Sequence, residues 1–148
     1  MFFRCPITKV VWGIVAQTIG ANDAPGNLNQ YWKWIDKYFP NNKQVHSFGL
    51  AAICWAIWKA RNRACFDKKL IRHPTEIICH ACSFMDFWTG LHKVDLQAQL
   101  NDGMKILLAT ACRILVNQQS APPAPLRLMP VPEEDGQEDE HLTTRADN

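Results

Sequence analysis

The sequence has few glycines, and none of them forms a motif that marks a catalytic or nucleotide-binding site. The seven glycines are scattered through 148 residues, so no glycine-rich loop is present to cradle a phosphate group. No serine lies in a nucleophile elbow, and the acidic residues of positions 1–118 form no paired-carboxylate motif. We therefore expect that the protein is not an enzyme.

Long apolar runs are missing as well. The best candidate, residues 50–58, is much shorter than the roughly 20 residues that a membrane-spanning helix requires. Residues 10–16 are apolar and follow Arg4, but Pro6 and Lys9 lie between them and no small-residue cleavage site follows, so a secretion signal is not convincing. We expect an intracellular protein, in the nucleus or the cytoplasm, that does not contact a membrane.

The cysteines do not form the pattern of a disulfide framework. The six positions are Cys5, Cys54, Cys65, Cys79, Cys82 and Cys112. Five of them fall in predicted helices among apolar neighbours, so we expect free thiols that pack as small hydrophobic side chains. Cys79 and Cys82 have the spacing of half a zinc site, but no second pair follows and the pair lies inside a predicted helix. Buried thiols are the favoured interpretation, with a metal site as the alternative.

Proline and acidic residues are concentrated at the C-terminal end. Residues 119–148 hold five prolines, seven acidic and two basic residues, and almost no large apolar side chains, which predicts a disordered tail. The tail carries a net charge of −5, whereas residues 1–118 carry +7. This division suits a body that binds polyanions and a tail that competes for it or keeps the protein soluble. The alternative is that the body and the tail are two segments of unrelated composition that are joined without a shared role.

Apolar residues recur at helical spacing in five segments, and no segment has the alternation typical of a strand. The predicted helices cover residues 6–20, 28–39, 43–66, 75–90 and 96–117. We therefore predict an all-α fold with about five helices in a small irregular bundle. Six tryptophans supply material for its core, or for a face that docks onto a protein partner.

The central predicted helix carries a stripe of mostly apolar residues along one face. The stripe consists of Phe48, Ala51, Ala52, Trp55, Trp58, Asn62 and Phe66. This spacing assigns Trp55, Trp58 and Phe66 to the packing side of the helix.

Positive charge is concentrated just beyond these tryptophans, in residues 59–72, which we call the basic segment. Its cations, opposed only by Asp67, are Lys59, Arg61, Arg63, Lys68, Lys69 and Arg72. Cations at this density suit contacts with the phosphates of RNA or DNA, and neighbouring aromatic rings can stack on exposed bases. The alternative is that the charges only complement the dipole at a helix C-terminus.

Two blocks of the sequence resemble a known family. Residues 55–66 read Trp-x-x-Trp-x-x-Arg-Asn-x-x-x-Phe, which resembles a block near the C-terminal end of plant LINE-type (non-LTR) retrotransposon polyproteins. Residues 2–6, Phe-Phe-Arg-Cys-Pro, followed by Val11-Trp12, resemble the end of the reverse transcriptase zinc-binding domain that precedes this block in the family. The resemblance covers residues 2–92 and is weak between the two blocks.

The resemblance implies RNA or DNA binding during target-primed reverse transcription. The family's zinc site takes two cysteines, one histidine and a final cysteine, and only the final one has a counterpart here, Cys5. One ligand cannot hold zinc, so we expect Cys5 to be vestigial and no cofactor to be bound. The catalytic carboxylates of the reverse transcriptase and the nuclease motifs have no counterpart either.

These expectations divide the chain into three parts. Residues 1–20 are expected to be the truncated end of the zinc-binding domain, residues 21–118 a helical region with the basic segment, and residues 119–148 the tail. Three hypotheses about function follow. The protein is a non-catalytic retrotransposon remnant that binds nucleic acid weakly, a helical module that docks on another protein through its tryptophan-rich faces, or a chain without a selected function.

Overall fold

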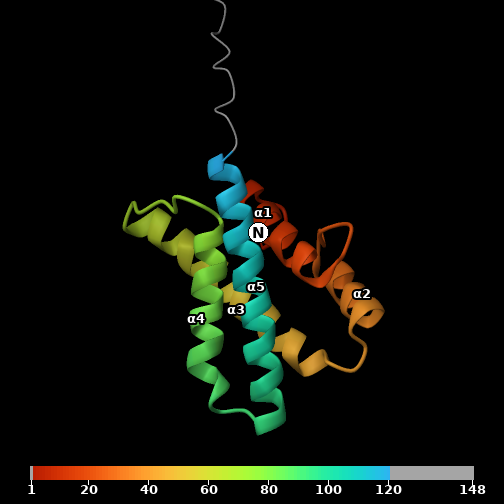
Figure 1. Ribbon diagram of the computed structural model, residues 1–148. Helices are drawn as coiled ribbons and strands as arrows, with labels where there is room; N and C mark the ends of the chain where they lie inside the picture. Colours follow the sequence, from red (N-terminus) through yellow and green to blue (C-terminus); the bar gives the residue numbers. More distant parts are fainter. Residues whose placement is uncertain (1, 121–148) are drawn as a thin grey trace, which may run out of the picture.

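The computed structural model describes residues 2–120, and this part of the chain folds into five α-helices without a strand (Figure 1). The helices are α1 (Pro6–Ile19), α2 (Leu28–Tyr38), α3 (Lys43–Phe66), α4 (Thr75–Thr89) and α5 (Val94–Ser120). The predicted all-α fold is therefore confirmed. The predicted disordered tail lies outside the described residues, except for residues 119 and 120, which belong to α5 and correct the predicted boundary.

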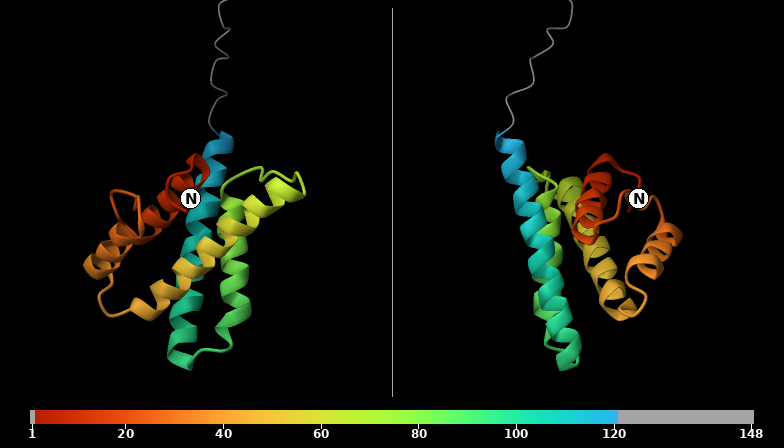
Figure 2. Two further views of the ribbon diagram at one scale, coloured as in Figure 1. Left: turned by 180° about the vertical axis from the view of Figure 1, so that it is seen from behind. Right: turned by 45° about the vertical axis from the view of Figure 1, so that its right-hand side comes forward.

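The helices form two layers around one core. α4 and α5 lie side by side and antiparallel, and α3 crosses them obliquely on one side (Figures 1 and 2). α1 and α2 lie on the same side of the α4–α5 pair as α3 (Figure 2). The most extensive helix contacts join α3 to α4 and α4 to α5, and α1 packs mainly against α5.

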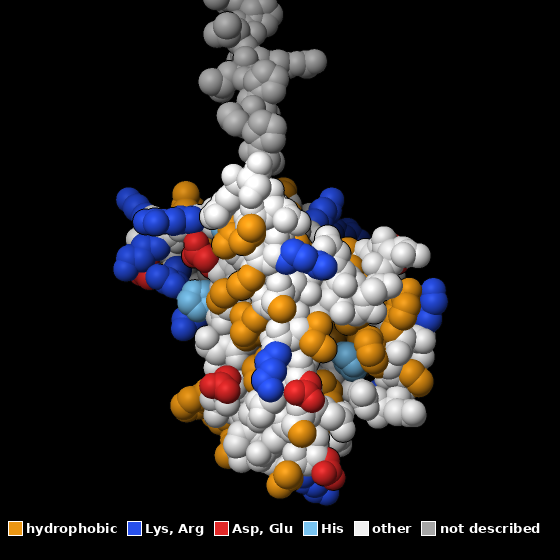
Figure 3. All heavy atoms as spheres, viewed as in Figure 1, with side chains coloured by type: hydrophobic (Ala, Val, Ile, Leu, Met, Phe, Trp, Pro, Cys, Tyr) orange, Lys and Arg blue, Asp and Glu red, His pale blue; other side chains and the backbone are white. Residues whose placement is uncertain are grey.

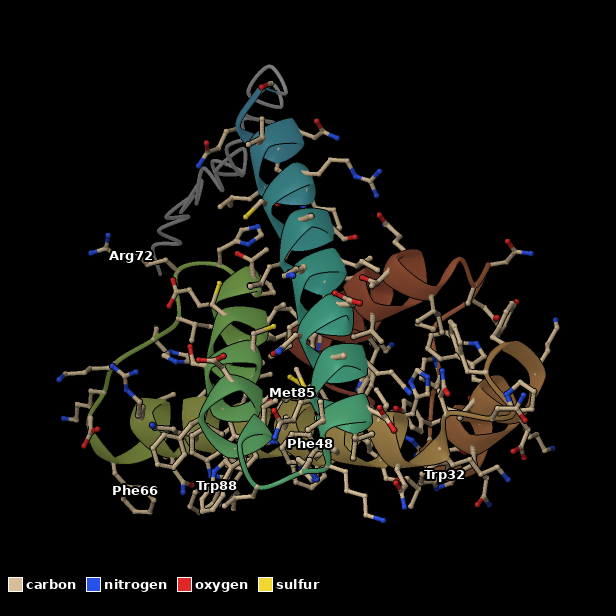
Figure 4. All side chains as sticks on the ribbon, turned by 60° about the horizontal axis from the view of Figure 1, so that its bottom comes forward. Trp32, Phe48, Phe66, Arg72, Met85 and Trp88 are labelled. Atoms are coloured by element: carbon tan, nitrogen blue, oxygen red, sulfur yellow. The ribbon has the colours of Figure 1, made fainter. Side chains whose placement is uncertain are left out.

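Every helix contributes apolar side chains to the core. Among the largest fully buried side chains are Trp12, Ile14, Ile35, Ile57, Ile77, Ile78 and Leu100. Figure 4 shows Met85 and Phe48 between α3 and the α4–α5 pair. Because α1 supplies Val11, Trp12 and Ile14 to the same cluster as the later helices, residues 6–19 pack as part of this bundle.

Local sequence signals explain where α1 begins and ends and where α2 begins. Pro6 occupies the first turn of α1, where its missing N–H costs nothing, and Gly20 closes the helix with φ 73°, a left-handed conformation that suits glycine. Asn27 caps α2 by accepting a hydrogen bond from the Gln30 N–H (2.9 Å). The Gln30 side chain accepts one in return from the Gly26 N–H (2.6 Å). These reciprocal bonds fix the entry of the chain into α2.

Aromatic contacts connect the N-terminal segment to α1, α2 and α3. The Trp12 indole Nε1 donates to the Phe2 carbonyl (2.7 Å), and its ring stacks on Phe3 with centroids 4.9 Å apart. Tyr31 meets the Trp12 ring edge-on and donates its hydroxyl proton to the carbonyl of His46 (2.8 Å). Residues 2–3 are thereby held against the bundle.

The packing face predicted for α3 is right for Phe48, Ala52 and Trp55, which are buried or pack on the core, and wrong for Trp58 and Phe66. The buried side chains are Ala52, Ile53, Ala56 and Ile57, whereas Trp58 is 48% exposed and Phe66 is 82% exposed. Residues 50–58 are apolar on nearly every side of the helix, so their periodicity does not specify a face. The small side chains of Ala52 and Ala56 favour close approach of α4, and the bulky rings are left outside.

Candidate nucleic-acid interface

The basic segment covers the C-terminal turns of α3 and the loop that leads to α4. Its cationic side chains, Lys59, Arg61, Arg63, Lys68, Lys69 and Arg72, are all exposed. Figure 3 shows lysine and arginine side chains gathered over the free end of α3 and this loop. The structure thus brings together, on one end of the bundle, the residues that the sequence singled out.

The way α3 ends places the loop cations beside the helix cations. The N–H groups of Asp67 and Lys69 both donate to the Arg63 carbonyl, at 3.0 and 3.1 Å, which reverses the chain after the last turn. Lys68 lies between them in the left-handed region, with φ 54°. This conformation is costly for a residue with a side chain. The reversal keeps Lys68 and Lys69 next to α3.

The rest of the loop is held by α4 and α5. The Glu76 carboxylate accepts hydrogen bonds from the backbone N–H groups of Arg72 (3.0 Å) and His73 (3.3 Å). The His73 ring is hydrogen-bonded through Nδ1 to the Thr75 hydroxyl (2.9 Å) and through Nε2 to the Gln118 side chain. The loop is therefore fixed at the start of α4 and at the last turn of α5.

The cations of the basic segment have no acidic partners among residues 2–120. The ion pairs in that part of the chain join Lys43 to Asp36 (2.8 Å) and Lys105 to Asp102 (3.7 Å). Lys59 instead lies over the Trp55 ring, with its Nζ 4.7 Å from the ring centroid. Positive charge in the segment is thus available to an anion from outside.

The surface of the segment is open and not a deep pocket. A hollow of about 40 Å³ lies between Lys59, Arg63 and Lys69 on one side and Glu76 and His80 on the other. Such a volume holds only a few water molecules. A ligand of any size must therefore contact the outer surface, as an extended polyanion can.

Residues 55–66, the block that resembles the retrotransposon family (the family-like block), contribute two aromatic rings to this surface. Trp58 and Phe66, predicted to pack inside, are exposed beside the cations, and Phe66 points away from the bundle (Figure 4). Trp55 alone behaves as predicted, half-buried and packed on Phe84 with ring centroids 4.6 Å apart. Leu70, which the sequence analysis did not single out, is 81% exposed in the same segment.

The cysteines are distributed differently from the prediction. Cys82 is buried, and burial together with the neighbouring Cys79 thiol raises its pKa to about 12, so it stays protonated. Cys65, Cys79 and Cys112 are exposed, which corrects the prediction of buried helical thiols. Cys5, which the family resemblance identifies with the last zinc ligand, is half-buried, and its carbonyl accepts a hydrogen bond from the Lys9 N–H (2.9 Å) at the start of α1. Within residues 2–120 no three His, Cys, Asp or Glu side chains are grouped so that they can hold a metal.

A second apolar surface lies where α4 turns into α5. We call it the apolar tip, and it consists of Phe87, Trp88, Leu91 and Val94. Phe87, Leu91 and Val94 are each about three-quarters exposed, at 76%, 75% and 77%, and Trp88 is 40% exposed. The start of α3 lies beside this turn, where Phe48 meets His92 with ring centroids 4.8 Å apart, but it leaves the four side chains of the tip exposed.

The described residues thus bring together an array of exposed cations, two exposed aromatic rings and a fixed loop. None of the helices in residues 2–120 is long and apolar enough to cross a membrane. Comparisons of the chain with protein-family models, with curated proteins and with solved structures find no match.

Proposed function

We propose that the protein is a non-catalytic relative of the C-terminal region of plant LINE-type reverse transcriptases and that it binds RNA or DNA weakly through the basic segment. The observation that carries the proposal is the exposure of all six cations at one end of the bundle, without an ion pair to any acidic residue among positions 2–120. Phosphates of a nucleic acid supply the negative charge that such a surface lacks.

The family-like block supports the proposal from a separate direction. Its Arg61 projects from α3, and Lys59 and Arg63, on the other side of the helix, line one hollow with Lys69 of the loop. Six phosphate contacts at most give an affinity that falls steeply as salt rises. Weak, salt-sensitive binding is therefore the expected behaviour.

The test is the binding of a labelled oligonucleotide at about 50 mM and about 200 mM salt, by the wild type and by a triple variant of the loop cations. The variant is Lys68→Gly, Lys69→Gln and Arg72→Gln. Glycine at position 68 removes the charge and also relieves the left-handed φ of 54°. The backbone bond from Arg72 to Glu76 is kept, so the loop stays folded.

We expect the triple variant to bind more weakly and to reduce the slope of log K against log salt by about 2 to 3, roughly one for each lost contact. A matched control carries Lys9→Gln, Lys33→Gln and Lys93→Gln, which removes the same charge from exposed positions outside the segment. The proposal fails if the wild type does not bind at low salt, or if the control weakens binding as much as the triple variant.

The apolar tip favours a second candidate function, which is docking on a protein partner. Three side chains of the tip are about three-quarters exposed, and they adjoin the Phe84–Trp88 pair, whose ring centroids are 6.1 Å apart. Exposed apolar clusters of this kind commonly mark protein contacts. A protein that binds oligonucleotides and stays monomeric in light scattering favours the first candidate over this one.

A further inference from the structure

The exposed aromatic rings of α3 indicate which kind of nucleic acid suits the surface of the basic segment. Trp58 and Phe66 are 48% and 82% exposed. Trp58 lies on the side of α3 opposite the buried Ala52, Ala56 and Ile57, and Phe66 is the last residue of the helix. Contacts with the phosphates of a duplex need only cations. Two exposed rings among those cations therefore call for a ligand that also offers flat apolar faces.

The distance between the two rings suits a nucleic-acid strand that runs in an extended form along α3. Eight residues separate Trp58 from Phe66, which places them about 12 Å apart along the helix axis and within about a quarter turn of each other. Arg61 follows Trp58 by three residues and Arg63 precedes Phe66 by three, so each ring has an arginine as a surface neighbour. Asn62, four residues from both rings, supplies an amide between them.

The loop cations extend this surface beyond the helix. Phe66 and Arg72 lie on the same side of the bundle but project in different directions (Figure 4), and Lys68 and Lys69 lie between them in the chain. A strand that stacks on Trp58 and Phe66 can thus continue along the loop with its phosphates near cations.

We infer that the basic segment binds single-stranded nucleic acid in preference to duplex, with Trp58 and Phe66 as stacking platforms for unpaired bases. The inference rests on the proposed function and specifies its ligand. In a duplex the base faces are covered by neighbouring base pairs, whereas each base of a single strand has a face available to an aromatic ring. Charge complementarity identifies the partner as a polyanion, and the interleaving of rings with arginines favours a strand over an anionic lipid surface, which takes a continuous apolar face.

The experiment uses the full chain and two labelled probes, a single strand of about 20 thymidylates and a duplex of about 20 base pairs, at about 50 mM salt. The variant is Trp58→Ala with Phe66→Ala, and the control is Phe87→Ala, which removes an exposed ring from the apolar tip. A third variant, Trp58→Phe, keeps a ring at position 58. Thermal melts followed by circular dichroism verify that each variant is folded.

We expect the wild type to prefer the single strand and the double alanine variant to lose at least about tenfold in affinity for it, since each lost stack costs about 5- to 150-fold. Its affinity for the duplex and its salt slope should stay within about twofold of wild type because the cations remain. Trp58→Phe with Phe66 intact should keep most of the single-strand binding, and Phe87→Ala should bind as the wild type does.

The outcomes separate this inference from the proposed function. Equal binding of both probes, with no effect of the double variant, overturns the inference and leaves the proposed function in place. Absence of binding to either probe overturns the proposed function itself. Anionic phosphatidylserine vesicles are a further arm, and binding to vesicles without binding to oligonucleotides assigns the surface to a lipid headgroup and overturns both.

Discussion

His46 lies where partial burial favours the neutral form of its ring. It is half-buried at the start of α3, with its ring centroid 4.8 Å from that of Phe39 and its carbonyl bonded to the Tyr31 hydroxyl. Burial lowers the pKa of the His46 imidazole below its usual value. The unfolded chain therefore takes up a proton at this position before the folded chain does.

The sign of the resulting pH dependence follows from linkage. As pH falls through about 6.5, the unfolded state gains a proton that the folded state does not hold, so the free energy of unfolding falls. We predict that His46→Gln loses less stability than the wild type when the pH is lowered from about 7 to about 5.5, as measured by urea denaturation. Parallel losses in the two proteins would contradict the role assigned to His46.

Tryptophans show how far a residue type predicts its location. Trp12 is fully buried, and its indole donates a hydrogen bond to a backbone carbonyl. Trp58, which the α3 stripe assigned to the packing side, is exposed because α3 carries apolar residues on nearly every side. Trp34 is buried with an indole Nε1 that has no hydrogen-bond partner among the described residues. Hydrophobicity alone does not separate these cases, because tertiary neighbours decide which ring is covered.

At the scale of single elements, the end of α1 depends on one backbone conformation. Gly20 has φ 73°, and an added Cβ would meet no atom within 4 Å, so the cost of a side chain there is conformational and not steric crowding. We predict that Gly20→Ala lowers the free energy of unfolding by about 1–2 kcal/mol. Chemical denaturation measures the change.

Gly13 supplies the matched control for this substitution. It lies inside the same helix, and an added Cβ likewise meets no atom within 4 Å. Alanine at position 13 should raise the free energy of unfolding by about 0.5–1 kcal/mol, because it restricts the unfolded chain and suits a helix. Changes of the same sign at positions 13 and 20 would show that the left-handed conformation does not govern the end of α1.

The sequence predicted the limits of most helices well, and their buried faces less well. The prediction for α3 was confirmed at both ends because polar and proline residues interrupt the pattern before Lys43 and after Phe66. α5 extends further than predicted, to Ser120, because residues 117–120 are all polar and give no apolar period. The basic segment was found from its charge, but the exposure of Trp58 and Phe66 depends on where α4 packs, which local sequence does not encode.

At the scale of the whole molecule, charge is divided between the helical body and the C-terminal residues. Residues 133–140 contain six acidic side chains, and the net charge of the chain is +2. For the polyanion binding proposed above, we expect those acids to reduce the attraction, through space and by competition for the same cations.

We predict that replacing the six acidic residues of positions 133–140 by their amides raises the affinity for an oligonucleotide several-fold at about 50 mM salt. The net charge then rises while the helical body is unchanged. Fluorescence anisotropy measures the affinity, and the difference between the two proteins should shrink at high salt because charge interactions are screened. An equal or lower affinity of the amide variant at low salt would contradict the prediction.

The attachment of the α3–α4 loop at both ends has a consequence for the thermodynamics of binding. Arg63, Glu76 and Gln118 hold the backbone that carries Lys68, Lys69 and Arg72 before any ligand arrives. A free loop would lose conformational entropy on binding. This loop has already lost that entropy during folding. The ligand proposed above would therefore have to order only side chains, and the helical core, without touching it, would contribute to affinity by keeping the loop in place.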